Sequence, residues 1–239
     1  MIIDIIPCLN DNYSYLICDE KTNNIIIVDP SEFSPCDKII SQKYKKLDYI
    51  LNTHHHFDHV GGNNKLKKKY GSKILGFEND KERIPEIDIF LKNNQDFKIG
   101  DLNFKTLFIP GHTSGHIAFY LKKEKIIFTG DTLFSLGCGR IFEGTYQQMF
   151  DSLNKIKDLP EDTKIYCGHE YTLQNSNFCI THDPQNLNLQ NKITKIKKKL
   201  NDNKPTIPTI LKDEKECNIF LRAKNVESFS KLRDLKDNF

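Results

Sequence analysis

A run of seven residues, Thr53-His54-His55-His56-Phe57-Asp58-His59, places four of the chain's eight histidines within six positions. In an extended backbone, residues i and i+2 project to the same side, so His54 and His56 can reach one ion together while His55 points away. Asp58 and His59 follow at once and can serve a second ion. Imidazole and carboxylate suit zinc, iron or manganese. We therefore expect this run to line a metal site, the alternative being a surface histidine cluster or a fortuitous run.

Three further residues of metal-ligand type recur downstream in a similar context. His112, Asp131 and His169 each lie one to three residues beyond an apolar run and beside a glycine, and the histidine run likewise follows residues 49–51. Strand ends on one edge of a sheet lie close in space, and strands are rigid carriers for a site. The pattern predicts five or six protein ligands for two ions.

The remaining pattern mixes strands and helices, which favours an α/β layered fold. Strands are predicted at residues 2–6, 13–18, 25–28, 49–51, 73–76, 97–99, 103–108, 116–121, 126–129 and 164–166. Helices are predicted at residues 34–46, 58–70 and 145–159, whereas residues 78–92 have no clear preference.

The character of the chain changes after Glu170. Helices are predicted at residues 171–181, 183–200 and 225–235, the second with an apolar stripe and a lysine-rich opposite face that we interpret as solvated. In the last helix, Val226, Phe229 and Leu232 are expected to face inward. We therefore expect a catalytic domain over residues 1–170 and a small all-α domain over residues 171–239.

Composition narrows the functional classes. The net charge of +3 is too small to indicate nucleic-acid binding, and 38% hydrophobic residues suffice for a buried core. No leader or membrane segment is recognisable, and the seven scattered cysteines form no C-x-x-C pair, which fits a reducing compartment. We expect a cytoplasmic monomer that binds a small molecule and neither membrane nor nucleic acid.

Four segments resemble the metallo-β-lactamase superfamily. The histidine run matches its H-x-H-x-D-H motif, and later motifs follow in order as Pro110-Gly111-His112-Thr113-Ser114-Gly115-His116, Thr129-Gly130-Asp131-Thr132-Leu133 and Cys167-Gly168-His169-Glu170-Tyr171. Within the superfamily the chain resembles the glyoxalase II family. The segments that indicate this family are Gly137-Cys138-Gly139-Arg140, Phe142-Glu143-Gly144-Thr145, Gly168-His169-Glu170-Tyr171 and Phe220-Leu221-Arg222.

The resemblance implies a four-layer αββα sandwich with the site at a sheet edge. It also implies two divalent metal ions, zinc first, with iron or manganese as alternatives. His54, His56 and His112 would bind one ion, Asp58, His59 and His169 the other, and Asp131 would bridge them. Asp131 and Asp58 would be the catalytic carboxylates.

The reaction that the resemblance implies is hydrolysis of S-D-lactoylglutathione to glutathione and D-lactate by a metal-bridging hydroxide, the second step of methylglyoxal detoxification. Glutathione carries two carboxylates, so cations and donors should bind it. By resemblance these are Arg140, Tyr171, Arg222 and Lys224. Some relatives have lysine at position 140 and tyrosine at position 142, where Phe142 lacks a hydroxyl donor.

Alternatives remain open for several residues. Arg140 can be structural, and Arg222 and Lys224 can be ordinary surface charges. Asp29, at a strand end, either orients a ligand histidine or caps a turn. His55 and His116 are expected not to be ligands, and Cys138 is expected to pack rather than to react.

Two rival functions also remain. The first is a persulfide dioxygenase-like mononuclear iron enzyme of the same superfamily. The second is a nucleic-acid-binding relative, suggested by the lysine-rich helix.

Overall fold

The computed structural model describes residues 1–239 and divides into two compact units. The first comprises Met1–Phe108 and Gly115–Glu124, and the second comprises Ile109–Ser114 and Lys125–Phe239. Each is described in turn.

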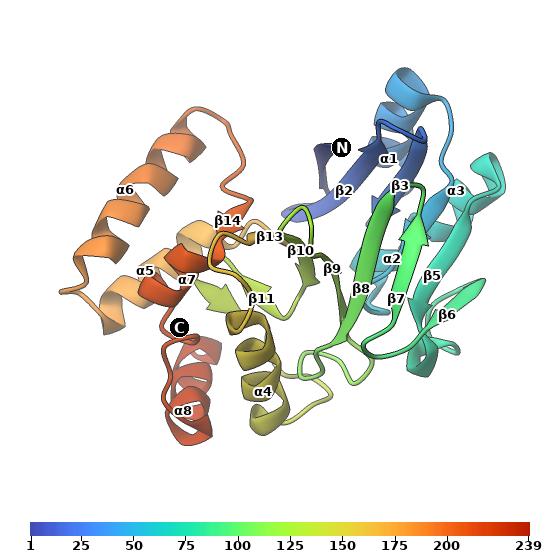
Figure 1. Cartoon of the computed structure of the whole chain (residues 1–239). Helices are drawn as coiled ribbons and strands as arrows, with labels where there is room; N and C mark the ends of the chain where they lie inside the picture. Colours follow the sequence, from blue (N-terminus) through green and yellow to red (C-terminus); the bar gives the residue numbers. More distant parts are fainter. The chain divides into compact units, whose positions relative to one another are not determined.

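The first unit contains a six-stranded sheet whose strands follow the order of the sequence (Figure 1). Its strands are β1 (Ile2–Cys8), β2 (Asn12–Asp19), β3 (Asn24–Val28), β4 (Tyr49–Leu51), β5 (Lys73–Phe77) and β6 (Ile89–Leu91). The pairs β1–β2 and β2–β3 are antiparallel, and the pairs from β3 to β6 are parallel. Strand β3 reads as a continuous apolar run because both of its faces are buried.

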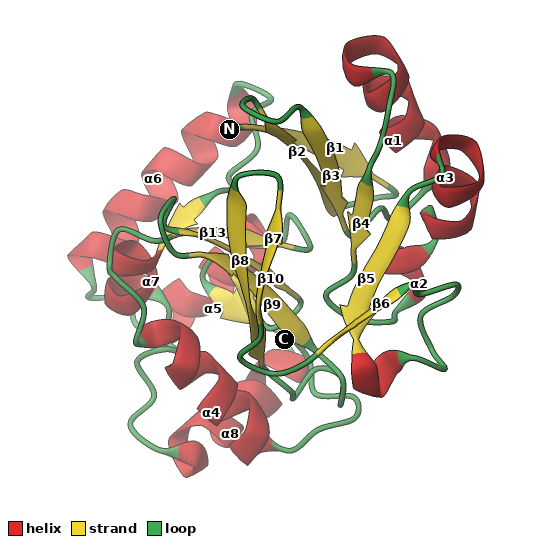
Figure 2. Cartoon of the chain, turned by 45° about the vertical axis from the view of Figure 1, so that its right-hand side comes forward, coloured by secondary structure: helices red, strands yellow, loops and turns green.

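Two layers cover this sheet. On one face lie α1 (Phe33–Ile39), the π-helical turn η1 (Ile40–Tyr44) and α3 (Asn63–Tyr70) (Figure 2). Ile25 and Ile27 point into the core on this side, whereas Ile26 between them is not part of it. On the other face lie the antiparallel strands β7 (Asp96–Ile99), β8 (Leu102–Phe108) and β9 (Ile117–Leu121). There Phe77 stacks on Phe108 with ring centroids 4.8 Å apart.

The second unit combines short strands with most of the helices. Strand β10 (Ile126–Gly130) pairs in parallel with β13 (Lys164–Cys167), which pairs antiparallel with β14 (Thr209–Ile210), while β11 (Leu133–Phe134) and β12 (Gly137–Cys138) form a hairpin. The helices are α4 (Tyr146–Lys157), α5 (Thr172–His182), α6 (Leu187–Asn201), α7 (Leu211–Cys217) and α8 (Val226–Asp237). Capping boxes at Thr145 and Asn225 begin α4 and α8 by satisfying free backbone N–H groups.

The expected helix over residues 58–70 is wrong as a single element. It is divided into α2 (Phe57–Val60) and α3, with Gly61 and Gly62 between them. A Cβ atom at Gly61 would lie 2.5 Å from the Ser31 carbonyl oxygen, and one at Gly62 would lie 2.8 Å from that of Pro30. This close approach requires glycine at both positions. The expected end of the helix is confirmed, because Gly71 has the left-handed conformation with φ of 71°.

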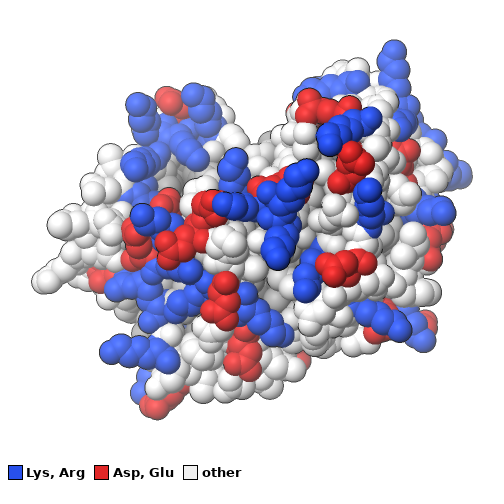
Figure 3. Space-filling model, viewed as in Figure 1, with Lys and Arg blue, Asp and Glu red and all other residues white.

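The lysine-rich face of α6 is exposed only in part. Lys195, Lys197, Lys198 and Lys199 are exposed, and Figure 3 shows basic side chains gathered over α6 among charges of both signs. The prediction is wrong for Lys192. Its side chain is 11% exposed, and its Nζ lies 2.6 Å from Oε1 of the fully buried Glu214. A buried ammonium requires such a partner.

All seven cysteines are buried and free, as expected from their spacing. None of the helices combines the length and the apolar composition that a bilayer crossing requires.

Candidate metal centre and surrounding residues

The histidine run of the first unit begins just beyond β4 and enters α2. His54 and His59 are completely buried, with ring centroids 4.1 Å apart, and the ring of His56 lies 4.8 Å from that of His54. Three of the four predicted ligands in this run, His54, His56 and His59, therefore lie together. The fourth, Asp58, has a side chain that is 36% exposed, and its Oδ2 lies 3.5 Å from His59 Nε2.

Asp29 organises this cluster from the end of β3. Its Oδ1 accepts a hydrogen bond from the Thr53 amide at 2.8 Å, and its Oδ2 accepts one from the Thr53 hydroxyl at 2.6 Å. The same Oδ2 lies 3.1 Å from His59 Nδ1. Asp29 is 3% exposed, so all these bonds are made away from solvent. Of the two roles left open for Asp29, the structure supports the orientation of a histidine.

These bonds determine the tautomers of two histidines. An ionised carboxylate only accepts, so His59 carries its proton on Nδ1 and presents the lone pair of Nε2. The Thr53 hydroxyl donates its proton to Asp29 and can therefore only accept from His54 Nδ1, 3.0 Å away. His54 also presents Nε2. Asp29 thus prepares both rings for metal binding, one directly and the other through Thr53.

The two histidines that were not expected to be ligands have other surroundings. His55 Nδ1 lies 3.6 Å from Oδ2 of the buried Asp80. His116 is fully buried and stacks on the His54 ring, with centroids 4.6 Å apart and planes 19° apart. Packing by His116 limits the rotation of His54.

The second unit brings together His112, Asp131 and His169. Each follows a strand, as the sequence pattern predicts, and each is 4–6% exposed. Oδ2 of Asp131 lies 3.2 Å from His169 Nε2 and 3.5 Å from His112 Nε2. One carboxylate oxygen thus faces two ring nitrogens, which is the arrangement of ligand atoms around a cation.

The backbone fixes the ring of His112. Its Nδ1 lies 2.7 Å from the carbonyl oxygen of Arg140. A carbonyl only accepts, so Nδ1 is protonated and Nε2 carries the lone pair that can bind a metal. His54, His59 and His112 therefore share one preparation: an acceptor on Nδ1 and Nε2 available for a metal. This donor chemistry fits a divalent ion with imidazole and carboxylate ligands.

Aromatic side chains surround the second-unit cluster. Tyr171 stacks on His169 with centroids 4.6 Å apart and planes 6° apart, and Phe134 lies edge-on to both rings. Phe142, 61% exposed, lies edge-on to His112. Among the predicted substrate-binding residues, Tyr171 is thus adjacent to a predicted ligand.

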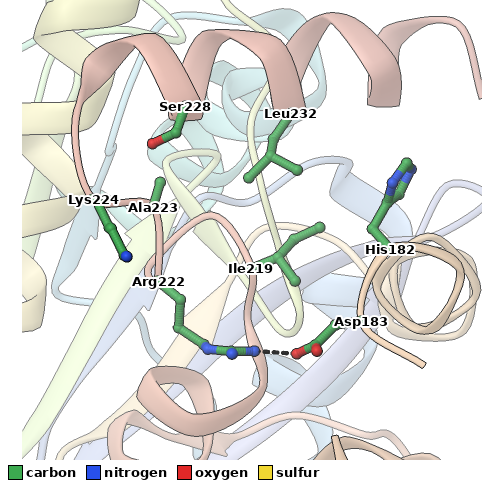
Figure 4. Close-up of a pocket in the computed structure, with 8 residues that line it drawn as sticks. All are labelled: His182, Asp183, Ile219, Arg222, Ala223, Lys224, Ser228 and Leu232. Carbon is green, nitrogen blue, oxygen red and sulfur yellow. Dashed lines mark hydrogen bonds and ion pairs between the residues drawn. The ribbon is translucent and has the colours of Figure 1, made fainter. Parts of the chain in front are cut away.

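Arg222 and Lys224 line a cavity of about 350 Å³ in the second unit, formed by the end of α5, the loop before α8 and α8 itself (Figure 4). No predicted metal ligand lines it. Arg222 Nη1 donates to Oδ2 of Asp183, which also accepts from Asn186 at 2.9 Å. Burial alone would raise the pKa of Asp183, but the bonds from Arg222 and Asn186 outweigh it and hold the pKa below its usual value.

Arg140 has a partner that the sequence did not indicate. Its Nε donates to Oδ1 of Asp237 at 3.1 Å, and its side chain remains 54% exposed. Asp237 and Asp183 were missed because each lies far along the chain from its arginine, and a lone aspartate at a helix end carries no signal of such a partner. Cys138 is buried, as expected, and burial raises the pKa of its thiol.

The comparisons with known proteins agree with this geometry. The metallo-beta-lactamase superfamily matches residues 10–169, and the hydroxyacylglutathione hydrolase C-terminus matches residues 170–239. A hydroxyacylglutathione hydrolase of Pelagibacter ubique is 60% identical over 239 residues, which is 100% of both chains. One of Methylococcus capsulatus is 40% identical over 98% of this chain and 97% of that protein.

Solved structures agree as well. ETHE1 from Myxococcus xanthus superimposes with a TM-score of 0.76 at 25% identity, over 98% of this chain and 90% of that chain. The expected α/β sandwich of the metallo-β-lactamase type is thereby confirmed. The chain belongs to the hydroxyacylglutathione hydrolase (glyoxalase II) family of the metallo-β-lactamase superfamily.

Proposed function

We propose that the seven residues predicted as ligands hold two divalent ions, with zinc as the first candidate and iron or manganese as alternatives. The division follows the family: His54, His56 and His112 on one ion, Asp58, His59 and His169 on the other, and Asp131 on both. The observation that carries this proposal is the shared preparation of His54, His59 and His112, whose Nδ1 atoms each meet an acceptor. Family membership and these donor sets make the protein a divalent-metal enzyme.

As a member of this family, the enzyme hydrolyses the thioester of a 2-hydroxyacylglutathione to glutathione and the 2-hydroxy acid. When bound, the ions lower the pKa of water from about 16 to near 7 and polarise the thioester carbonyl. The Asp131 carboxylate lies between His112 and His169 and orients their ligand atoms. The Asp58 carboxylate likewise orients the ligand atom of His59. No serine or cysteine nucleophile is required, which fits the burial of every cysteine.

The substrate-binding part of the proposal rests on charge. Glutathione carries two carboxylates and one ammonium group, and Arg140, Tyr171, Arg222 and Lys224 are proposed to bind it. Arg140 and Arg222 supply planar guanidinium groups that match carboxylates, and Tyr171 supplies a hydroxyl. We assign this role chiefly to the helical domain of residues 171–239.

We further propose a monomer that acts in the cytoplasm on S-D-lactoylglutathione, in the removal of methylglyoxal. The free cysteines support a reducing compartment. The charges of both signs over the face drawn in Figure 3 give no support to a nucleic-acid partner. The curated relatives carry the hydrolase name, which favours hydrolysis over the iron dioxygenase.

The test measures metal content and S-D-lactoylglutathione hydrolysis on the same preparation. His54→Ala and Asp131→Ala are expected to lose bound metal and activity together. His182→Ala is the matched control for metal content, because His182 is an exposed histidine that is not a predicted ligand. Its activity is not used as a control, because His182 lines the cavity of Arg222 and Lys224. Normal metal content and turnover in His54→Ala and Asp131→Ala would refute the ligand set. One iron per chain with oxygen uptake on a persulfide would refute the hydrolase.

A second variant tests the substrate site. Arg222→Ala is expected to raise KM while metal content stays at the wild-type level, since Arg222 contacts no predicted ligand. An unchanged KM would remove Arg222 from the substrate site.

A further inference from the structure

Arg233 is a charged residue almost completely buried within α8, at 4% exposure. Its guanidinium lies over the ring of Phe220, 5.3 Å from the centroid. Burying a cation costs free energy unless it is paired and hydrogen-bonded, so its partners are informative. A leucine would fill the same position on the helix without this cost.

The partners of Arg233 lie on two sides. Nη1 donates to the carbonyl oxygen of Cys138 at 2.8 Å, across 95 positions of the chain. Nη2 donates to Oδ1 of Asp237, one turn further along α8, at 2.9 Å. That same Oδ1 accepts from Nε of Arg140, and the Asp237 carbonyl accepts from Nη2 of Arg140 at 3.4 Å. Through these bonds α8 holds the main chain at position 138 and the side chain at position 140.

Residues 137–140 lie directly against the predicted metal ligands of the second unit. A Cβ atom at Gly139 would lie 1.9 Å from the carbonyl oxygen of Asp131 and 3.3 Å from Nδ1 of His112. Only glycine fits there. The next residue, Arg140, supplies the carbonyl that accepts the hydrogen bond from His112 Nδ1. A shift of this segment would therefore move the group that fixes the His112 tautomer.

We propose that Arg233 and Asp237 are positioning residues of the active site. By holding residues 138–140 they place the Arg140 carbonyl against His112 and the Arg140 guanidinium in the pose that meets a substrate carboxylate. The inference rests on the proposed function, since it takes His112 as a ligand and Arg140 as a substrate contact. A partly buried ion pair such as Arg233–Asp237 adds little to stability by itself, and it selects one geometry, which is what a ligand-orienting carbonyl needs.

Two substitutions separate these effects. Arg233→Met removes the bond to Cys138 and keeps most of the apolar stem. The affinity of the metal-free protein for Zn²⁺, measured by competition with a chromophoric chelator, is expected to fall about 10- to 100-fold. Arg233→Lys keeps the charge but not both bonds, so its affinity is expected to lie between Arg233→Met and wild type.

Asp237→Asn removes the charge that holds Arg140. Binding must then immobilise a freer arginine side chain, so KM for the glutathione thioester is expected to rise roughly two- to tenfold with little change in kcat. Lys231→Met is the matched control, because Lys231 lies on the same helix and pairs only with the exposed Glu227, at 2.8 Å. It is expected to leave both quantities at the wild-type level.

The outcomes separate this inference from the proposed function. Wild-type protein that binds no Zn²⁺ would refute the proposed function. If the wild type binds Zn²⁺, then wild-type affinity in folded Arg233→Met overturns the inference, and so does an unchanged or lowered KM in Asp237→Asn. If Arg233→Met does not fold, the Zn²⁺ affinity of Arg233→Lys is the test. A reduced Zn²⁺ affinity supports the inference, and wild-type affinity overturns it.

Discussion

Replacement of Asp29 by asparagine should weaken metal binding more than it weakens the fold. The Asp29 carboxylate accepts three hydrogen bonds: two from Thr53, at its amide and hydroxyl, and one from His59 Nδ1. An asparagine has only one acceptor oxygen. If its amide nitrogen takes the place of Oδ1, it faces the Thr53 N–H, and one buried donor loses its acceptor. If it takes the place of Oδ2, it faces His59 and the Thr53 hydroxyl instead.

The orientation with the amide nitrogen in place of Oδ1 is the less costly, so it gives the smallest expected losses of stability and of Zn²⁺ affinity. One buried donor without an acceptor costs about 1–3 kcal/mol of the free energy of unfolding. His59 keeps an acceptor but loses the negative charge that makes its Nε2 more basic, so the affinity for Zn²⁺ is expected to fall about tenfold. In the second orientation the protonated Nδ1 of His59 is opposed by another donor, and the loss approaches about 100-fold.

The assay compares Zn²⁺ affinity, by chelator competition, with the unfolding temperature of the metal-free protein. Asp48→Ala is the matched control. Asp48 Oδ2 accepts from the Ile25 amide at 2.7 Å, so the alanine variant loses a similar backbone bond, but the contacts described for Asp48 involve no histidine. We expect a stability loss in both variants and an affinity loss only in Asp29→Asn. Wild-type Zn²⁺ affinity in Asp29→Asn would refute the assignment of Asp29 as the residue that orients His59.

Two further predictions concern stability. Lys192→Met leaves the buried Glu214 without its ammonium partner and should cost about 3 kcal/mol in chemical denaturation, because Thr209, Leu136 and Asn218 still donate to it. Adding Glu214→Gln should restore part of this loss, and no restoration would show that the charge is not the cause. Burial alone would raise the pKa of Asp19, but hydrogen bonds from Asp101, Thr22 and Lys21 outweigh it and lower the pKa to about 2. Because the folded pKa is depressed, this stabilisation is present above about pH 4 and is lost as the pH falls through 2. The melting temperatures of metal-free wild type and Asp19→Asn should therefore differ at pH 7 and converge near pH 2, whereas an equal difference at both values would contradict the assignment.

The elements that sequence alone predicts best are those determined by residues adjacent in the chain. The strand at residues 25–28 is recognisable because β3 is apolar on both faces, and the helix end at Gly71 because only glycine adopts its conformation at low cost. The positions of His54, His112 and Asp131 follow from the same strand pattern. Their assignment as ligands remains a prediction, which the variants above test.

What sequence could not predict depends on partners distant along the chain. Lys192 and Arg233 both occupy helix positions for which the sequence pattern predicts exposure. Arg233 is buried and the Lys192 side chain is only 11% exposed, because an acceptor lies near each of them in space. In α8 the expected inward residues were Val226, Phe229 and Leu232, and the structure buries Phe229 and Arg233. The break at Gly61 likewise arises from the Ser31 carbonyl, 30 positions earlier. Periodicity reports which face of a helix is apolar, and it carries no information on such pairs.

The two units orient their histidines with acceptors of different kinds, so substitutions affect the two sets of histidines in different ways. In the first unit the acceptor is the carboxylate of Asp29, so a single side-chain substitution can alter both the geometry and the basicity of His59. In the second unit the acceptor of His112 is a backbone carbonyl, which every residue at position 140 retains. A substitution cannot change the charge of this carbonyl group, but it can change the position of the carbonyl. The surroundings that set this position are Gly139, which admits the close approach, and Arg233 and Asp237, which hold the segment. Substitutions that shift this carbonyl should therefore act through Gly139 and Arg233, and at position 140 only through loss of the side-chain bond to Asp237.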